Sequence, residues 1–307
     1  MSNANGLASP ILILTNERDF AADTVINCIN ERGVAVERWN TEGRPNIQWR
    51  PDACPVTADY RSVWLRQFLP EPTVTQSVPL VDDFLVAREQ WRTWLADLAE
   101  YEPTRWMNPL WPSRRAENKL AQLRVASRVG LAVPRTLVTN NRADALLLQS
   151  EVGSCIVKAV ASAYFPFSNS AFMFTTPLND ALALGDADWA SQPVVVQQSI
   201  HPRTDVRIFI VGEFAAAAST QVDGPDWRLG SKDARWSPCT PPAPIIEGCR
   251  AYINAFGLAY GAFDFAIDDR TWWFLECNQA GEFAFADRPL KLGVADAIAN
   301  WLIGDSS

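Results

Sequence analysis

Two acidic side chains and one amide lie on neighbouring strand-like segments near the end of the chain. Asp264 is in the apolar run 261–267, and Glu276 and Asn278 belong to the next such run. Because side chains alternate along a strand, Glu276 and Asn278 share one face, and Asp264 can reach that face from its own strand. Two carboxylates and an amide oxygen are ligands that Mg²⁺ prefers when it also binds phosphate oxygens. The residues alone leave a second interpretation open, an exposed strand with scattered acids.

Lysine is rare in this chain. Only four of the 27 cationic residues are lysines, and they are Lys119, Lys158, Lys232 and Lys291. Lys158 ends the apolar run CIVK, where a lysine usually has an anionic partner. Two separated lysines and an acidic Mg²⁺ site suggest a nucleoside triphosphate, and the apolar segment 194–200 could offer backbone groups to an adenine.

Several other chemistries are excluded by the sequence. It contains no GxxxxGK[ST] loop, no GxGxxG after the first strand and no GxSxG. The single histidine, His201, rules out a multi-histidine metal site and a histidine-based catalytic triad. We interpret His201 as a structural residue.

Composition narrows the class of protein. The chain has 307 residues, 48% of them hydrophobic, and a formal net charge of −8. This predicts a sizeable core and argues against a nucleic-acid or anionic-membrane partner. The six cysteines form no CxxC pair, and the sequence shows neither a signal peptide nor an apolar run of membrane-spanning length. We therefore expect a soluble, cytoplasmic protein.

The apolar pattern predicts an α/β chain. A strand at 11–14, a helix at 19–32 closed by Gly33 and a strand at 34–39 form a βαβ unit. A strand at 61–68, a loop at 69–80 and a helix at 82–100 follow, and three prolines in 103–113 mark a domain boundary. Ser113 is expected to cap a helix over 114–129. Later strands are expected at 133–139, 154–160, 171–176, 194–200, 206–211, 215–221, 261–267 and 272–277, with helices at 143–151, 244–256 and 294–302.

The order of these segments resembles the ATP-grasp ligases over essentially the whole chain. The resemblance is carried by Lys119, Lys158, QQSI (197–200), DVRIFIVG (205–212), GAFDFAI (261–267) and FLECNQAGEF (274–283). Further segments are similar to the peptide ligases of graspetide (microviridin-type) biosynthesis, namely VWLR (63–66), WMNP (106–109), 115–141 and DWR (226–228). The resemblance implies an α/β (α+β) ATP-grasp fold with a Rossmann-like N-terminal domain, divided into 1–110, 111–195 and 196–307.

The same resemblance implies a nucleotide site. Lys119 and Lys158 would contact the ATP phosphates, and Lys158 would also lie near the adenine. The hinge that holds the adenine by its backbone would consist of Gln198, Ser199 and Ile200, and Gln197 would also belong to the nucleotide site. The family usually has a glutamate where Gln198 stands.

It also implies the groups that act on the reacting atoms. Arg207 would stabilise the transferring phosphoryl group and the acyl phosphate. The ligands of Mg²⁺ would be Asp264, Glu276 and Asn278, with Gln279 at the position where the family usually has proline. The acidic core of a precursor peptide would contact Asp226, Trp227 and Arg228.

The implied function is an ATP-dependent macrocyclase with a ribosomal precursor peptide, leader plus acidic core, as its substrate. It would activate Asp or Glu side chains as acyl phosphates and join them to Thr, Ser or Lys. One alternative is a RimK-like or glutathione-synthetase-like ligase that forms an amide on a small acid or a protein terminus. A non-catalytic nucleotide-binding module is another.

The aromatic residues of 84–111 could serve domain packing or a homodimer contact.

Overall fold

The computed structural model describes residues 9–43, 45–53, 56–68, 81–100, 104–161, 164–165, 171–172, 175–201, 203–221 and 235–304. Three parts of the sequence predictions lie outside these ranges. They are the expected loop 69–80, most of the segment 161–170 that follows Lys158, and the DWR residues 226–228.

The N-terminal sheet is parallel, as a βαβ unit requires. It contains β1 (Ile11–Thr15), β2 (Val36–Asn40), β3 (Ser62–Leu65) and β4 (Arg105–Met107) in the order β2-β1-β3-β4. The helix α1 (Phe20–Glu31) begins where Asp19 accepts a hydrogen bond from the Ala22 amide and ends before Gly33, whose φ is +71°. The predicted βαβ unit is therefore confirmed, and a short 3₁₀ helix, η1 (Val56–Asp59), precedes β3.

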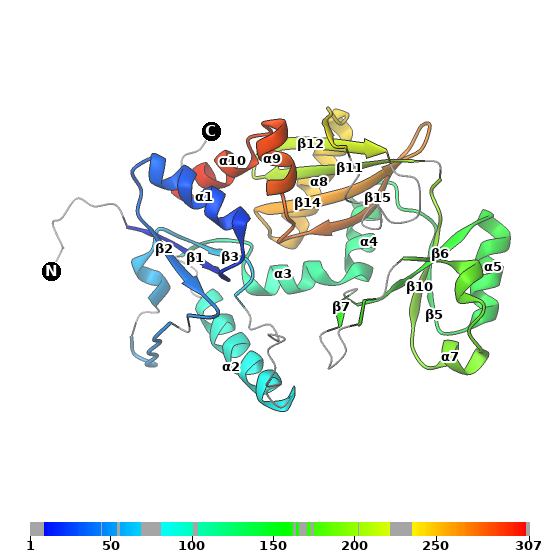
Figure 1. Ribbon diagram of the computed structural model, residues 1–307, viewed down its shortest axis with the longest axis horizontal. Coiled ribbons are helices and arrows are strands. Elements are labelled where there is room, and N and C mark those ends of the chain that lie inside the picture. The colour runs from blue at the N-terminus through cyan, green and yellow to red at the C-terminus, as the bar shows by residue number, and fades with distance from the viewer. Residues whose placement is uncertain are drawn as a thin grey trace.

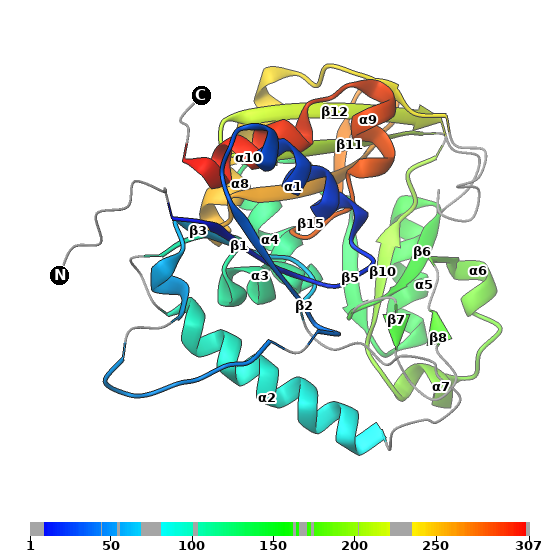
Figure 2. The same cartoon turned by 60° about the vertical axis from the view of Figure 1, so that its left-hand side comes forward.

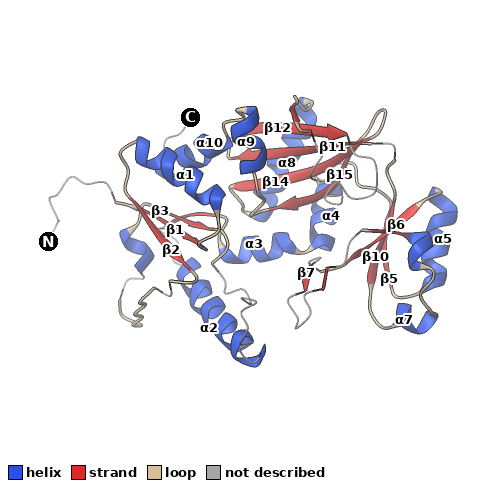
Figure 3. Ribbon diagram, viewed as in Figure 1, coloured by secondary structure: helices blue, strands red, loops and turns tan. Residues whose placement is uncertain are grey.

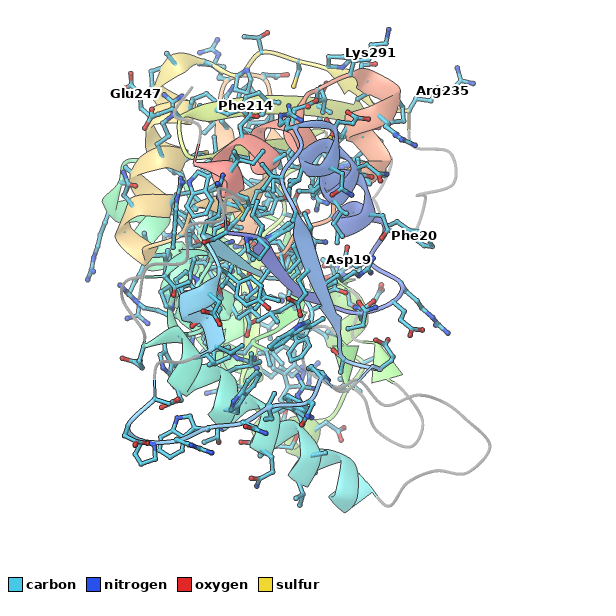
Figure 4. All side chains as sticks on the ribbon, turned by 90° about the vertical axis from the view of Figure 1, so that its left-hand side faces the viewer. Asp19, Phe20, Phe214, Arg235, Glu247 and Lys291 are labelled. Atoms are coloured by element: carbon cyan, nitrogen blue, oxygen red, sulfur yellow. The ribbon has the colours of Figure 1, made fainter. Side chains whose placement is uncertain are left out.

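A buried ion pair ties α1 to the end of β3. Arg66 donates from Nε and Nη2 to the two carboxylate oxygens of Asp19, at 2.7 and 3.1 Å, and both side chains are 1% exposed. Figure 4 shows Asp19 directed into the molecule at the start of α1, next to Phe20 on the surface. Burial alone would raise the pKa of Asp19, but the charge and hydrogen bonds of Arg66 outweigh it and lower that pKa.

Asp19→Asn is expected to lower the free energy of unfolding by about 3 kcal/mol, because it leaves the buried Arg66 charge with only the exposed Glu282 carboxylate, 3.9 Å away, as a counter-charge. The wild-type advantage should be complete above pH 3.8, the ordinary pKa of the carboxyl, and shrink as pH falls through the lowered folded-state pKa. Urea denaturation at a series of pH values measures both effects. Asp296→Ala is the control, because its ion pair with Arg32 is solvent-exposed and should contribute less than about 1 kcal/mol. Equal free energies of unfolding for wild type and Asp19→Asn at pH 7 would contradict the prediction.

α2 (Val81–Ala99) connects β3 to β4, the last strand of the N-terminal sheet. The segment that joins this sheet to the rest is also helical, with α3 (Leu110–Glu117) and α4 (Lys119–Arg128). The prediction of a single helix capped by Ser113 is wrong. Ser113 lies inside α3, and the chain is interrupted at Asn118, whose extended backbone and side-chain oxygen cap the amides of Leu120 and Ala121.

The central sheet is antiparallel along its paired strands. Its order is β5-β10-β6-β9, with β5 (Thr136–Thr139), β10 (Val194–Gln198), β6 (Cys155–Ala159) and β9 (Thr176–Pro177). The helices α5 (Arg142–Val152), α6 (Leu178–Ala181) and α7 (Asp186–Ala190) enclose its core. The short strands β7 (Tyr164–Phe165) and β8 (Ala171–Phe172) pair with each other.

The C-terminal sheet is antiparallel and has the order β13-β12-β11-β14-β15. Its strands are β11 (Thr204–Val211), β12 (Phe214–Gln221), β13 (Ser237–Pro238), β14 (Tyr260–Ile267) and β15 (Trp272–Asn278). β14 and β15 form the hairpin that the sequence predicts. One face of the sheet packs on α4 and α8 (Ala243–Phe256), and the other packs on α1 and α10 (Val294–Ile303) beside α9 (Ala284–Leu290).

The three sheets are arranged along the long axis of the molecule. Figure 1 shows the N-terminal sheet at one end and the central sheet at the other, with the C-terminal sheet between them. Figure 2 shows that α2 runs away from these layers, and Figure 3 shows helices covering the C-terminal sheet. The expected boundary at 195/196 falls inside β10, which pairs with β5 and β6. Within the described ranges, none of the helices has the length and apolarity that a membrane span needs.

Candidate active site

Three charged residues form a row across three strands of the C-terminal sheet. In the strand register Arg207 of β11 is opposite Asp264 of β14, and Asp264 is opposite Glu276 of β15. Directly opposed residues of antiparallel strands project on the same face, so the three side chains are neighbours. The expectation that Asp264 and Glu276 share a face is therefore confirmed.

A β-bulge in β15 produces this arrangement. Phe274 is opposite Phe265, but Glu276 is opposite Asp264, so Leu275 is an extra residue on β15. If the regular pairing continued from Phe265 and Phe274, Glu276 would be opposite Phe263, on the face that packs against α8. The bulge thus turns Glu276 out of the apolar core and places it beside Asp264.

Arg207 and Asp264 form a two-pronged ion pair. The Nε and Nη2 atoms of Arg207 each lie 2.7 Å from a carboxylate oxygen of Asp264, and Nη1 donates to the carbonyl oxygen of Glu282 at 3.5 Å. Burial disfavours the guanidinium charge, but Asp264 outweighs burial and raises the pKa of Arg207 above its ordinary value. Arg207 is therefore a permanent cation, and its planar fork can hold a carboxylate and a phosphate on different edges.

Glu276 and Asn278 supply further oxygen atoms on the same face. Glu276 is half-buried and makes no hydrogen bond or ion pair with any residue of the described ranges. Asn278 is exposed, and its Oδ1 accepts a hydrogen bond from the Ala280 amide at 3.2 Å. Two neighbouring carboxylates of which one lacks a protein partner fit a hard divalent cation. Within the described ranges, no three His, Cys, Asp or Glu side chains cluster as a metal site, so such a cation would need the Asn278 amide and phosphate oxygens.

The two predicted phosphate-binding lysines meet at the end of β6. Lys119, the first residue of α4, donates from Nζ to the carbonyl oxygen of Ala159 at 3.2 Å. The neighbouring Lys158 donates from Nζ to Oε1 of Gln197 at 3.0 Å. Gln197 is 2% exposed and in turn donates to the Thr136 hydroxyl at 2.9 Å, so its amide oxygen faces the lysine. The structure therefore brings Lys119, Lys158 and Gln197 together, although Lys158 and Gln197 are 39 residues apart in sequence.

Residues 198–200 connect β10 of the central sheet to the C-terminal sheet, as a hinge between them would. The Gln198 amide donates to the carbonyl oxygen of Arg135 at 2.8 Å, and the Ser199 amide donates to that of Ser154 at 2.9 Å. Two of the three hinge amides are thus bonded within the protein. Ile200 is 6% exposed, and its amide donates to no residue of the described ranges. Of the three amides, that of Ile200 is therefore the one left available as a donor to a ligand.

Two buried amides that the sequence analysis did not assign to the site contact the hairpin. They are Asn108, in the WMNP segment, and Gln122, on α4, at 1% and 5% exposure. Both bind backbone atoms of residues next to Asn278. Both residues lie in segments that carry the family resemblance, Asn108 in WMNP and Gln122 in 115–141, but the resemblance gave neither of them a role.

Phe285 of α9 lies beside Arg207 and packs against Trp236, just before β13. The guanidinium carbon of Arg207 is 5.7 Å from the ring centre of Phe285, and Phe285 packs edge-on against Trp236 at 5.4 Å between ring centres. Trp236 follows closely on the 222–234 segment, which includes the predicted substrate residues outside the described ranges.

No family model and no curated protein matches the sequence. Solved structures do match. A RiPP-associated ATP-grasp ligase of Chryseobacterium gregarium, solved with ADP and a leader and core peptide, matches at TM-score 0.84 and 21% identity over 97% of this chain and 98% of that chain. The macrocyclase MdnC of Microcystis aeruginosa, bound to precursor peptide MdnA, matches at TM-score 0.79 and 24% identity over 96% and 100%. The ATP-grasp ligase PsnB, complexed with a minimal precursor, Mg and ADP, matches at TM-score 0.77 and 21% identity over 99% of each chain.

This chain therefore has the ATP-grasp fold, and the expected fold class is confirmed. Along its whole length it is built like the RiPP-associated ATP-grasp ligases, from the N-terminal sheet to α10.

Proposed function

We propose that the protein is an ATP-dependent peptide ligase that forms ester or amide crosslinks between side chains of a precursor peptide. The observation that carries the proposal is the row Arg207–Asp264–Glu276, a permanent cation beside two carboxylates, of which Glu276 forms no hydrogen bond or ion pair with a described residue. The similar structures with ADP, Mg and precursor peptides support ATP, Mg²⁺ and a leader-plus-core peptide as ligands.

The reaction would proceed in two displacements. An oxygen of a substrate Asp or Glu carboxylate attacks the γ-phosphorus of ATP, the bond from that phosphorus to the bridging oxygen breaks, and ADP leaves. A hydroxyl oxygen of Thr or Ser, or a Lys amine, then attacks the carbonyl carbon of the acyl phosphate. Inorganic phosphate leaves and the nucleophile loses its proton. The peptide has lost one molecule of water for each crosslink, and no nucleophile of the enzyme is needed.

The residues of this chain would act mainly by position and charge. Lys119 and Lys158 would hold the phosphates, and the hinge 198–200 would hold the adenine. Mg²⁺, bound by Asp264, Glu276 and Asn278, would neutralise charge on the phosphate oxygens. Arg207 would stabilise the transferring phosphoryl group.

The finer assignments belong to the same proposal. Asp226, Trp227 and Arg228 would contact the acidic core of the peptide, and the exposed cation Arg235 lies next to that segment. We also propose that the chain divides into the domains 1–110, 111–195 and 196–307 and that the protein is cytoplasmic. A homodimer contact would lie near Trp111, which is 50% exposed.

The test uses a short peptide encoded beside this protein and rich in Thr and in Asp or Glu. Incubation with ATP and Mg²⁺ should yield the peptide minus one or more molecules of water by mass spectrometry, with one ADP for each bond. Tandem fragmentation assigns the linked residues. ATP turnover that depends on free glutamate or another small acid, with no change in the peptide mass, would instead support the RimK-like alternative. Binding of ATP without turnover of either substrate would support the non-catalytic module.

Lys158→Met is expected to raise KM for ATP about tenfold, because it removes a cation from the phosphates and leaves the Gln197 amide oxygen without its donor. Steady-state ADP release at varied ATP concentration measures this. Lys291→Met is the control, because Lys291 is the exposed residue at the C-terminal end of α9, at the edge of the molecule in Figure 4. Equal KM values for the two variants would exclude Lys158 from the nucleotide site.

A further inference from the structure

One side chain of α4 covers the open edge of β15. β15 is the last strand of its sheet, so the backbone of Cys277 has no neighbouring strand on its outer side. Gln122 takes that place. Its Nε2 donates to the Cys277 carbonyl oxygen at 2.9 Å, and its Oε1 accepts from the Cys277 amide at 3.0 Å. Nε2 also donates to the carbonyl oxygen of Ala116 at 2.6 Å, which fixes the orientation of the amide.

A second buried amide continues the hairpin beyond its last strand pair. Asn108, just after β4, donates from Nδ2 to the carbonyl oxygens of Tyr260 at 2.8 Å and Gln279 at 2.6 Å. Its Oδ1 accepts from the amides of Ala259 at 2.9 Å and Tyr260 at 3.0 Å. All four hydrogen-bonding positions of the side chain are used, and they link the start of β14 to the residue after Asn278.

Both amides are held in place by their own surroundings. Asn108 is 1% exposed and has a φ of +55°, a backbone conformation that few residues other than glycine adopt. Asparagine adopts it more readily than other side chains do, and here burial and four hydrogen bonds hold it. Gln122 is 5% exposed, one turn after Lys119 on α4.

The loop after β15 has little room to move away from this arrangement. A Cβ atom on Gly281 would lie 2.5 Å from Cβ of Ala262, which is opposite Asn278 in the hairpin. The Tyr260 hydroxyl donates to the carbonyl oxygen of Gly281 at 2.8 Å. Backbone groups on both sides of Asn278 are therefore fixed.

We infer that Gln122 and Asn108 are positioning residues for the metal ligands Glu276 and Asn278. This inference rests on the proposed function. Neither side chain would touch the metal or the substrate. Gln122 holds Cys277, which lies between the two ligands, and Asn108 holds Gln279, which follows the second. An edge strand has no ladder bonds on its outer side. Gln122 supplies them at Cys277, and Asn108 holds the backbone just beyond the end of the strand.

The experiment compares two near-isosteric variants with a matched control. Gln122→Met keeps the volume and removes the hydrogen bonds, and Asn108→Asp keeps the shape and removes both donors. Ser62→Ala is the control, because its buried hydroxyl makes a 2.8 Å hydrogen bond to the carbonyl oxygen of Leu302, between the N-terminal sheet and α10 and away from the hairpin. Mn²⁺ is titrated into each protein with ADP and followed by electron paramagnetic resonance, and KM for ATP is measured at saturating Mg²⁺.

Each variant should raise the Mn²⁺ dissociation constant about tenfold, the lower end of the usual effect of removing a group that orients a metal ligand. The Mn²⁺ spectrum should change, KM for ATP should stay within about twofold, and Ser62→Ala should behave as wild type. Unchanged Mn²⁺ constants with only a lower melting temperature would overturn the inference. If Gln122→Met does not fold, Gln122→Asn, which keeps the amide one methylene short, gives the same comparison. A wild-type protein that binds ADP but no Mn²⁺ would overturn the proposed metal site itself, and the inference with it.

Discussion

Arg207→Lys is expected to lower kcat for ATP-dependent peptide dehydration by about a thousandfold, or about 4 kcal/mol of transition-state stabilisation. Lysine keeps the positive charge but offers a single point of attachment. It cannot hold both oxygens of Asp264 and a phosphoryl oxygen as a guanidinium fork does. Quenched time courses of peptide dehydration, together with ADP release, measure the change. KM for ATP should change by less than about threefold, because Arg207 would stabilise the phosphoryl group during its transfer and not the binding of ATP.

Arg203→Lys is the matched control for this experiment. Arg203 precedes the same strand and forms a similar two-pronged ion pair with Asp205, with N–O distances of 2.7 and 3.1 Å. It lies outside the proposed row, so its loss should leave kcat within about threefold of wild type. Equal losses in the two variants would mean that the ion pairs of β11 serve the stability of the sheet, and that Arg207 has no special part in phosphoryl transfer.

Glu276→Gln is expected to lower kcat at least a hundredfold and to raise the Mg²⁺ concentration needed for half-maximal activity. The substitution keeps the size of the side chain but removes one of the two negative charges that would hold Mg²⁺. A more weakly held Mg²⁺ neutralises less of the charge on the phosphate oxygens. Rates of ADP release at Mg²⁺ concentrations from micromolar to tens of millimolar measure both effects.

Asp269→Asn controls for the change in net charge. Asp269 is exposed in the turn of the same hairpin, so its substitution should leave the Mg²⁺ dependence unaltered. If Glu276→Gln dehydrated the peptide at the wild-type rate, the assignment of β14 and β15 as the metal-binding hairpin would fail.

Local sequence patterns predicted the elements of this fold well where the pattern has a single physical meaning. The βαβ start followed from a short apolar strand, a periodic helix and Gly33, each of which is a local signal. The pattern around Ser113 has more than one physical meaning, and the prediction from it is wrong. A serine before a helical pattern is a typical cap, but Asn118, five residues on, ends α3 and caps α4. Two capping residues in one segment compete, and packing against β15 and α8 selects between them.

The candidate residues were also visible in the sequence, because lysines and carboxylates in apolar strands are conspicuous. The structure places one of them at the start of a helix and the others on strands, in the order Lys119, Lys158, Arg207, Asp264, Glu276 and Asn278. Their roles remain predictions that the variants above test. What no local pattern contains is the distance between residues such as Lys158 and Gln197, which depends on the pairing of β6 with β10.

The sequence by itself determined the kinds of side chain available for the chemistry and their order along the strands. Only the tertiary structure decided which of them meet. Alternation from Phe274 would put Glu276 on the core face, and the bulge at Leu275 reverses this, because one extra residue shifts every later side chain of the strand to the opposite face. The partners of Gln122 and Asn108 are likewise backbone atoms about 150 residues away, and hydrogen bonds to backbone atoms leave no pattern in the partner's sequence.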